Sequence, residues 1–184
     1  MKVGPHDMGI LSERAVIKLR GSLISMIFQE PMMALDPLYK VGDQIAETVM
    51  RHKGVSRKAA YARALELLEL VPAPSPERRL KAFPDKLSGG LRQRVGIAMA
   101  LSCRSSLVLA DEPTTALDAS VEIQILVLLL GLQRDFGMSM IFVTNDLGVA
   151  AQIADQVAVM YAGRIDTRQI DAPGAAYPDG TGVC

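Results

Sequence analysis

The sequence predicts an α/β fold, because short apolar runs alternate along the chain with longer segments whose apolar residues recur at helical spacing. Residues 22–28, 106–110 and 140–144 form the apolar runs, which are typical of strands buried on both faces in a parallel sheet. The predicted helices are residues 41–70, 91–102, 119–136 and 147–155. This order of elements indicates a parallel sheet flanked by helices.

The first half of the chain has clear stop signals. The strand at residues 22–28 ends at the turn-like sequence Gln-Glu-Pro. The helical segment 41–70 is interrupted at Gly54, and Ser56 is a good N-cap for its second part. A proline-rich turn at residues 71–77 then leads to the sequence LSGG and the helix at 91–102. Residues 41–70 are therefore predicted to form a small helical insert.

The second half continues the alternation. The helix at 119–136 should end at Gly137, and a last strand is predicted at residues 157–163. Its apolar stripe comprises Val121, Ile125, Leu128, Leu129, Leu132 and Phe136. From residue 164 onward we expect irregular structure, and residues 171–184 are predicted to be an irregular tail.

Composition narrows the class of protein. Twenty basic and 20 acidic residues among 184 give no net charge, which argues against a nucleic-acid partner. The cysteines, Cys103 and Cys184, have no spacing typical of a metal site or a disulfide framework. No apolar stretch approaches the ~20 residues that a membrane-spanning helix needs, and the first residues lack the apolar core of a signal peptide. We expect a soluble protein in a reducing compartment.

The most specific motif is LSGGLRQR, residues 87–94. Ser88, Gly89 and Gly90 precede a helix, whose first-turn N–H groups lack partners within the helix and favour a negative charge. They are candidates for holding a phosphate. The alternative is that Ser88 simply caps a helix after a glycine turn.

Polar residues follow the three predicted strands. Asp111 and Glu112 come after residues 106–110, Gln29 follows residue 28, and Asn145 follows residue 144. Carboxyl ends of parallel strands open onto the ligand site, so Asp111 and Glu112 are placed to hold hydrated Mg²⁺ and to polarise a water. The alternative for Asp111 and Glu112 is that they cap the following helix.

These motifs together resemble the ATP-binding cassette (ABC) ATPases. LSGGLRQR resembles their signature sequence, VLADEPTTALD their Walker B strand and D-loop, and MIFQEP their Q-loop. Over roughly residues 9–163, the amino-acid sequence is similar to that of the ATPase subunits of bacterial dipeptide, oligopeptide and glutathione importers. The resemblance implies a partial P-loop NTPase-like core at residues 1–40 and 87–170, with a helical subdomain at 41–86.

The resemblance also implies residue roles. Gln29 and Asp111 are expected at Mg²⁺, and Glu112 is expected to be the general base. Ser88, Gly89 and Gly90 are expected to bind ATP held mainly by a second ATPase subunit. Asp118 is expected to communicate across that homo- or heterodimer. The implied partners are transmembrane permease subunits, and the implied location is the cytoplasmic face of the membrane.

Two features depart from this family. The phosphate-binding pattern GxxxxGK[ST] is absent from the 184 residues, so we expect the sequence to begin after it. Losing about four charge-assisted hydrogen bonds removes at least ~6 kcal/mol of binding, so the chain alone should bind ATP poorly. In addition, Asn145 stands where the family has its switch histidine, and an amide cannot take up a proton.

Two functions remain open. The first is an ATP-binding subunit of an importer for peptides or similar solutes, in a truncated and impaired form. The second is a non-catalytic half that lends its LSGG motif to ATP on an intact partner, so ATP hydrolysis by the chain itself stays undecided. DNA-repair and chromosome-structure ATPases share these motifs but insert a very long coiled coil, whereas Leu87 here follows Gln29 by only 58 positions.

Overall fold

The computed structural model describes residues 2–115 and 117–171, which form two compact units, one ending at Val143 and the other beginning at Thr144. Each unit is described by itself. The first unit contains β1 (Lys2–Val3), β2 (His6–Asp7), α1 (Glu13–Leu19), β3 (Ile24–Ile27), the 3-10 turn η1 (Pro31–Met33), α2 (Val41–Lys53), α3 (Arg57–Leu70), α4 (Pro76–Leu80), the 3-10 turn η2 (Pro84–Lys86), α5 (Gly89–Ala100), β4 (Leu107–Asp111), α6 (Ala119–Phe136) and β5 (Ser139–Val143).

The central sheet confirms the predicted α/β class. Strands β3, β4 and β5 lie in that order and are all parallel, with Ala110 of β4 paired to Ile27 of β3 and to Phe142 of β5. Apolar residues of α5 and α6 pack on the face that carries Ile27 and Ala110. The opposite face leaves Met26 and Ile141 exposed, so the expectation that every strand is buried on both faces is wrong in the described part of the chain.

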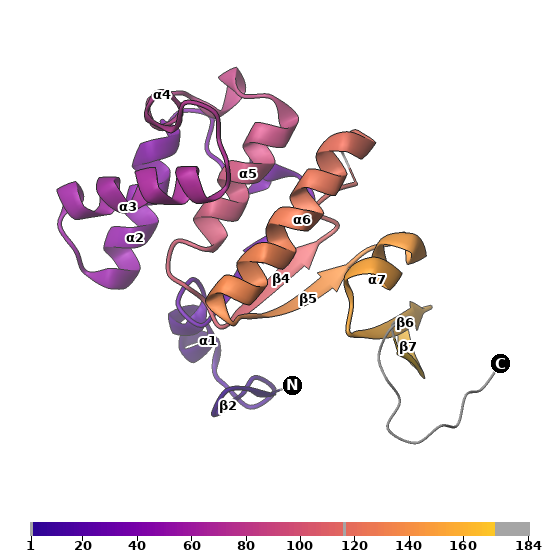
Figure 1. The fold of residues 1–184 in the computed structure, drawn as a ribbon. Coiled ribbons are helices and arrows are strands. Elements are labelled where there is room, and N and C mark those ends of the chain that lie inside the picture. The colour runs from indigo at the N-terminus through magenta and orange to yellow at the C-terminus, as the bar shows by residue number, and fades with distance from the viewer. Residues whose placement is uncertain (1, 116, 172–184) are drawn as a thin grey trace. The chain divides into compact units, whose positions relative to one another are not determined.

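Helix α6 has the predicted bounds and runs alongside β4 and β5 (Figure 1). It ends at Gly137, which has a φ of 59° in the left-handed region that glycine adopts at little cost. All six residues of its predicted stripe lie in or against the main core. Among the described helices, none is both long and apolar enough to cross a membrane.

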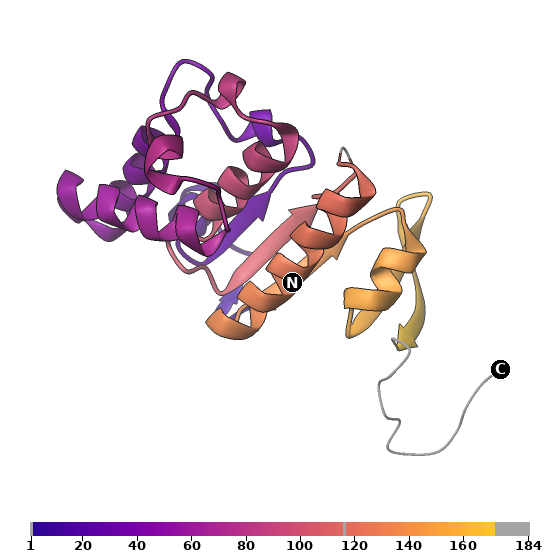
Figure 2. The same ribbon diagram turned by 45° about the horizontal axis from the view of Figure 1, so that its top comes forward.

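Residues 41–86, the range predicted to be a helical subdomain, contain α2, α3 and α4, which group together beside α5 (Figures 1 and 2). Gly54 ends α2 in the left-handed conformation, and the Ser56 hydroxyl accepts a hydrogen bond from the N–H of Ala59, so the predicted break and cap are confirmed. The helix predicted from residue 91 begins two residues earlier, at Gly89. Glycines carry no side chain for an apolar pattern to reveal, so the pattern missed this first turn.

The second unit contains α7 (Leu147–Ile153), β6 (Gln156–Tyr161) and β7 (Arg164–Asp171). The expectation of irregular structure from residue 164 is wrong, because β7 pairs antiparallel with β6. Ala162 and Gly163 both have positive φ between the pair Tyr161 and Arg164, as a two-residue type I′ turn requires. Apart from Asp171, the predicted tail lies outside the described residues.

Candidate functional site

Two predicted site residues, Gln29 and Glu112, meet where β3 and β4 end. The side-chain Nε2 of Gln29 donates a hydrogen bond of 2.8 Å to Oε2 of Glu112, although the residues are 83 positions apart. Parallel pairing of β3 with β4 brings the two strand ends to the same edge of the sheet. A carboxylate only accepts hydrogen bonds, so the NH₂ group of Gln29 has to face Glu112. This leaves Oε1 of Gln29 available as a ligand or acceptor.

Glu112 is fixed by its backbone as well as by its side chain. Its N–H donates to the carbonyl of Val143 at 3.0 Å, and Oε2 also accepts from the hydroxyl of Thr115 at 3.1 Å. Its φ of 40° lies in the left-handed region, which costs a non-glycine residue about 1–3 kcal/mol. Both side-chain bonds end on Oε2, so Oε1 receives none from the described residues. The free oxygen is placed to accept a proton.

Asp111 is the last residue of β4 and lies half-buried beside Glu112, in register with Val143. No group of three or more His, Cys, Asp or Glu residues in the described part of the chain could form a metal site. Mg²⁺ does not require such a group, because it is commonly held by one or two carboxylates together with substrate phosphates and waters. Asp111 and Oε1 of Gln29 fit that donor set.

The LSGG motif forms the N-terminal end of α5. Ser88 occupies the N-cap position, but its side chain makes no capping hydrogen bond. The interpretation of Ser88 as a simple helix cap is therefore not supported. Ser88 and Gly89 are exposed, so the free N–H groups of the first turn face outward. This end of α5 is open to a ligand.

The two glycines of the motif have different surroundings. A Cβ on Gly90 would lie 2.8 Å from Cγ1 of Val121, so Gly90 allows α5 to approach the first turn of α6. A Cβ on Gly89 would meet only Cδ2 of Leu117, at 3.9 Å, which is an ordinary contact. Packing therefore explains Gly90 and does not explain Gly89.

Gln93 is a residue that sequence reasoning missed. It is only 2% exposed, and its Nε2 donates to the carbonyl of Phe28, the neighbour of Gln29, at 3.4 Å. This bond connects the helix that begins with LSGG to the end of β3. A signal was available, because Gln93 shares one helical face with the apolar residues Ile97 and Ala100. Thr115 was also missed, although it follows Glu112 by three positions.

Asp118 makes no hydrogen bond with Gln29 or Glu112 among the described residues, and its role in the structure is a helix cap. Asp118 caps α6: its Oδ1 accepts from the N–H of Val121 and the hydroxyl of Ser120, both at 3.1 Å. The bond from Val121, followed by that from Ser120, lowers the pKa of Asp118. Asn145 is exposed in the second unit, so its place at the ATP site stays a prediction, as does the role of Asp118 across a dimer.

Comparison with curated proteins gives close relatives among peptide transport proteins. The oligopeptide transport ATP-binding protein OppD of Bacillus subtilis (strain 168) is 53% identical over 166 residues, which are 90% of this chain and 46% of the relative. The dipeptide transport ATP-binding protein DppD of the same organism is 52% identical over 159 residues, 86% of this chain and 48% of the relative. The chain spans about half the length of the curated relatives it matches.

Solved structures and a family model agree with these relatives. A dimeric ATP-binding cassette, MJ0796, in a post-hydrolysis state bound to ADP and Pi, matches with a TM-score of 0.77 and 29% identity, covering 90% of this chain and 69% of that one. CbiO1 of Clostridium perfringens matches with a TM-score of 0.75 and 27% identity, covering 88% and 61%. The ABC transporter family model matches residues 6–115, more than half of the chain. The sequence motifs, the fold and these matches agree, and the chain belongs to the ABC transporter family.

Proposed function

We propose that this chain is an ATP-binding subunit of an ABC importer for peptides or similar small solutes, and that it supplies part of a shared ATP site. The hydrogen bond between Gln29 and Glu112 is the observation that supports this most strongly, because it joins a candidate metal ligand to a candidate general base. Relatives named as oligopeptide and dipeptide transport proteins support the substrate class.

Glu112 acts as the general base in this proposal. Gln29 and Thr115 hold its Oε2, which orients the carboxylate and leaves Oε1 to accept a proton from the attacking water. Asp111 and Gln29 would hold Mg²⁺, and the ion would supply positive charge to the transferred phosphate. The proton is carried by Glu112 while the water oxygen attacks the γ-phosphorus and the bond to the β-phosphate oxygen breaks.

The end of α5 is the second nucleotide-binding element of this proposal. Free N–H groups at Gly89 and Gly90 and the unbonded hydroxyl of Ser88 suit the γ-phosphate, because the helix N-terminus favours negative charge. The 184 residues contain no GxxxxGK[ST], and in this proposal the loop that cradles the phosphates is supplied by a segment other than these residues. A second ATPase subunit, permease subunits and a position at the inner face of the membrane complete the proposal.

A non-catalytic role is the second candidate, favoured by Asn145 at the position of the switch histidine. In that case the chain lends Ser88, Gly89 and Gly90 to ATP on an intact partner, and Glu112 takes no part. Asn145 can donate one hydrogen bond to a phosphate but cannot exchange a proton.

The experiment mixes the purified chain with an intact peptide-importer cassette that carries its own GxxxxGK[ST] and measures ATP hydrolysis. Stimulation that is lost in both Ser88→Ala and Glu112→Gln supports the catalytic role. Stimulation lost in Ser88→Ala but kept in Glu112→Gln supports the lending role. Absence of stimulation, or stimulation that neither variant changes, contradicts both.

A further inference from the structure

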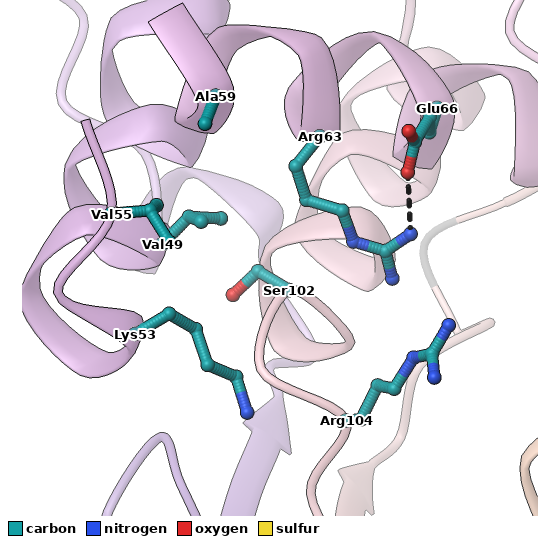
Figure 3. Close-up of a pocket in the computed structure, with 8 residues that line it drawn as sticks. All are labelled: Val49, Lys53, Val55, Ala59, Arg63, Glu66, Ser102 and Arg104. Carbon is teal, nitrogen blue, oxygen red and sulfur yellow. Dashed lines mark hydrogen bonds and ion pairs between the residues drawn. The ribbon is translucent and has the colours of Figure 1, made fainter. Parts of the chain in front are cut away.

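A cavity of about 460 Å³ opens between the end of α2, the middle of α3 and the segment that follows α5 (Figure 3). Its charged lining consists of Lys53, Arg63, Glu66 and Arg104. None of the candidate ATP-site residues lines it. The cavity therefore shares no residue with the ATP site proposed above.

The lining carries an excess of positive charge in a chain with no net charge. Three cationic side chains stand against one carboxylate, and that carboxylate, Glu66, bonds Nη1 of Arg63 at 3.0 Å. Lys53 is exposed and makes no ion pair or hydrogen bond with the described residues. About two positive charges thus remain without a partner in one opening.

Arg63 is only partly satisfied. Its Nη2 is shielded from solvent and makes no hydrogen bond in the described part of the chain, and a buried donor without an acceptor is costly. The side chains of Arg63 and Arg104 extend into the same opening (Figure 3), where two like charges repel each other. An anion bound between the two guanidinium groups offsets this repulsion.

Lys53 and Arg104 each have a structural role that explains the position of the side chain. Neither role neutralises the positive charge. Lys53 lies in the last turn of α2, where a cation complements the helix dipole. The guanidinium of Arg104 stacks over the ring of Phe136 at 5.7 Å. Stacking holds Arg104 in place and consumes none of its hydrogen-bond donors.

Apolar residues form another wall of the cavity. They are Val49, Val55 and Ala59, and Ser102 also lines the cavity (Figure 3). A cavity of this volume falls within the range of small-molecule sites, which combine an apolar lining with a few polar groups. An inorganic ion has no apolar part that could pack against Val49, Val55 and Ala59.

We propose that this cavity binds an organic phosphate or carboxylate. The anionic group lies between Arg63, Arg104 and Lys53, and a short apolar body lies against Val55 and Ala59. Binding does not require ATP, so the proposal does not depend on the function proposed above.

The test titrates the full 184-residue chain with phenyl phosphate, with benzoate and with the neutral benzyl alcohol by calorimetry. We expect saturable binding of at least one anion, with the tighter one identifying a phosphate or a carboxylate source, and weaker binding of benzyl alcohol. Lys53→Gln and Arg63→Gln should each weaken anion binding about tenfold, because each removes a charged donor. The exposed Lys58→Gln, on α3 but outside the lining, should leave it unchanged.

Lys53→Gln keeps the test valid if Arg63→Gln fails to fold, because Lys53 is exposed and unpaired. Absence of saturable binding by both anions overturns the proposal. Equal binding of benzyl alcohol, or unchanged anion binding in Lys53→Gln, overturns it as well.

Discussion

The amide of Gln29 donates to the carboxylate of Glu112 across 2.8 Å, and this bond joins the ends of two strands that are 83 residues apart in sequence. It gives each side chain a defined orientation: Oε1 of Gln29 and Oε1 of Glu112 are the atoms left without a bond from the described residues. The candidate metal ligand and the candidate proton acceptor are thereby placed next to each other.

Glu112→Asn should lower the free energy of unfolding by about 1 kcal/mol less than Glu112→Ala does, because both variants lose the bonds from Gln29 and Thr115 but asparagine tolerates the left-handed conformation better than alanine. Urea unfolding of the 184-residue chain measures this. The matched control is Glu122 in the first turn of α6, where Glu122→Asn should cost a few tenths of a kcal/mol more than Glu122→Ala because alanine favours the helix. The same order of the two variants at both positions contradicts strain at Glu112.

Gly90→Ala should lower the free energy of unfolding by about 1–3 kcal/mol, because its Cβ would lie 2.8 Å from Cγ1 of Val121. Gly89→Ala is the control, since its Cβ meets only an ordinary contact and alanine favours the helix. Chemical denaturation compares the two. Combining Gly90→Ala with Val121→Ala should recover part of the loss; a loss that is the same with either residue at position 121 contradicts this contact.

Ser88→Ala should change the stability by no more than about 0.5 kcal/mol, because the Ser88 side chain makes no capping bond. Ser56→Ala, at the N-cap of α3, should cost about 1 kcal/mol because it removes the bond to the N–H of Ala59. Thermal unfolding of both variants gives the comparison. Equal losses contradict the assignment of Ser88 as a free hydroxyl.

The stability of the first unit should fall as the pH rises above about 10, partly through Tyr61. Burial, and then its hydrogen bond to Asp43, raise the pKa of Tyr61 above its ordinary value of 10.0. Its contribution is therefore complete below that value and is lost as the pH rises through the folded-state pKa. Urea unfolding from pH 8 to pH 11 should show a shallower decline in Tyr61→Phe. The surface variant Tyr39→Phe controls for loss of a phenol; identical profiles for wild type and Tyr61→Phe contradict the prediction.

The apolar patterns were enough to predict the sheet and its covering helices. Helix α6 is the best case, because its stripe, its N-terminal Asp118 and its terminal Gly137 are all local signals. Strand β7 was not predicted, because the turn at Ala162 and Gly163 lacks the usual Asn-Gly or Asp-Gly sequence. Its extended structure depends on pairing with β6, which the local sequence does not show.

The candidate site was only partly accessible from the sequence. Motif spacing indicated Gln29 and Glu112 separately, but their direct hydrogen bond depends on the register of β3 and β4. The buried bond from Gln93 to Phe28 and the packing reason for Gly90 are likewise tertiary. A sequence shows which residue types are present, whereas the distance between segments is set by how the helices pack.

The central claim is that the end of α5 and the ends of β3 and β4 both respond to bound nucleotide. Its most direct test is NMR of the ¹⁵N-labelled chain, titrated with an intact, hydrolysis-deficient cassette loaded with ATP and Mg²⁺. We predict shifts of the Gly89 and Gly90 amides and of the Gln29 side-chain NH₂ that require ATP and weaken in Ser88→Ala. Shifts that are the same without ATP, or that leave these three groups unmoved, would contradict the account.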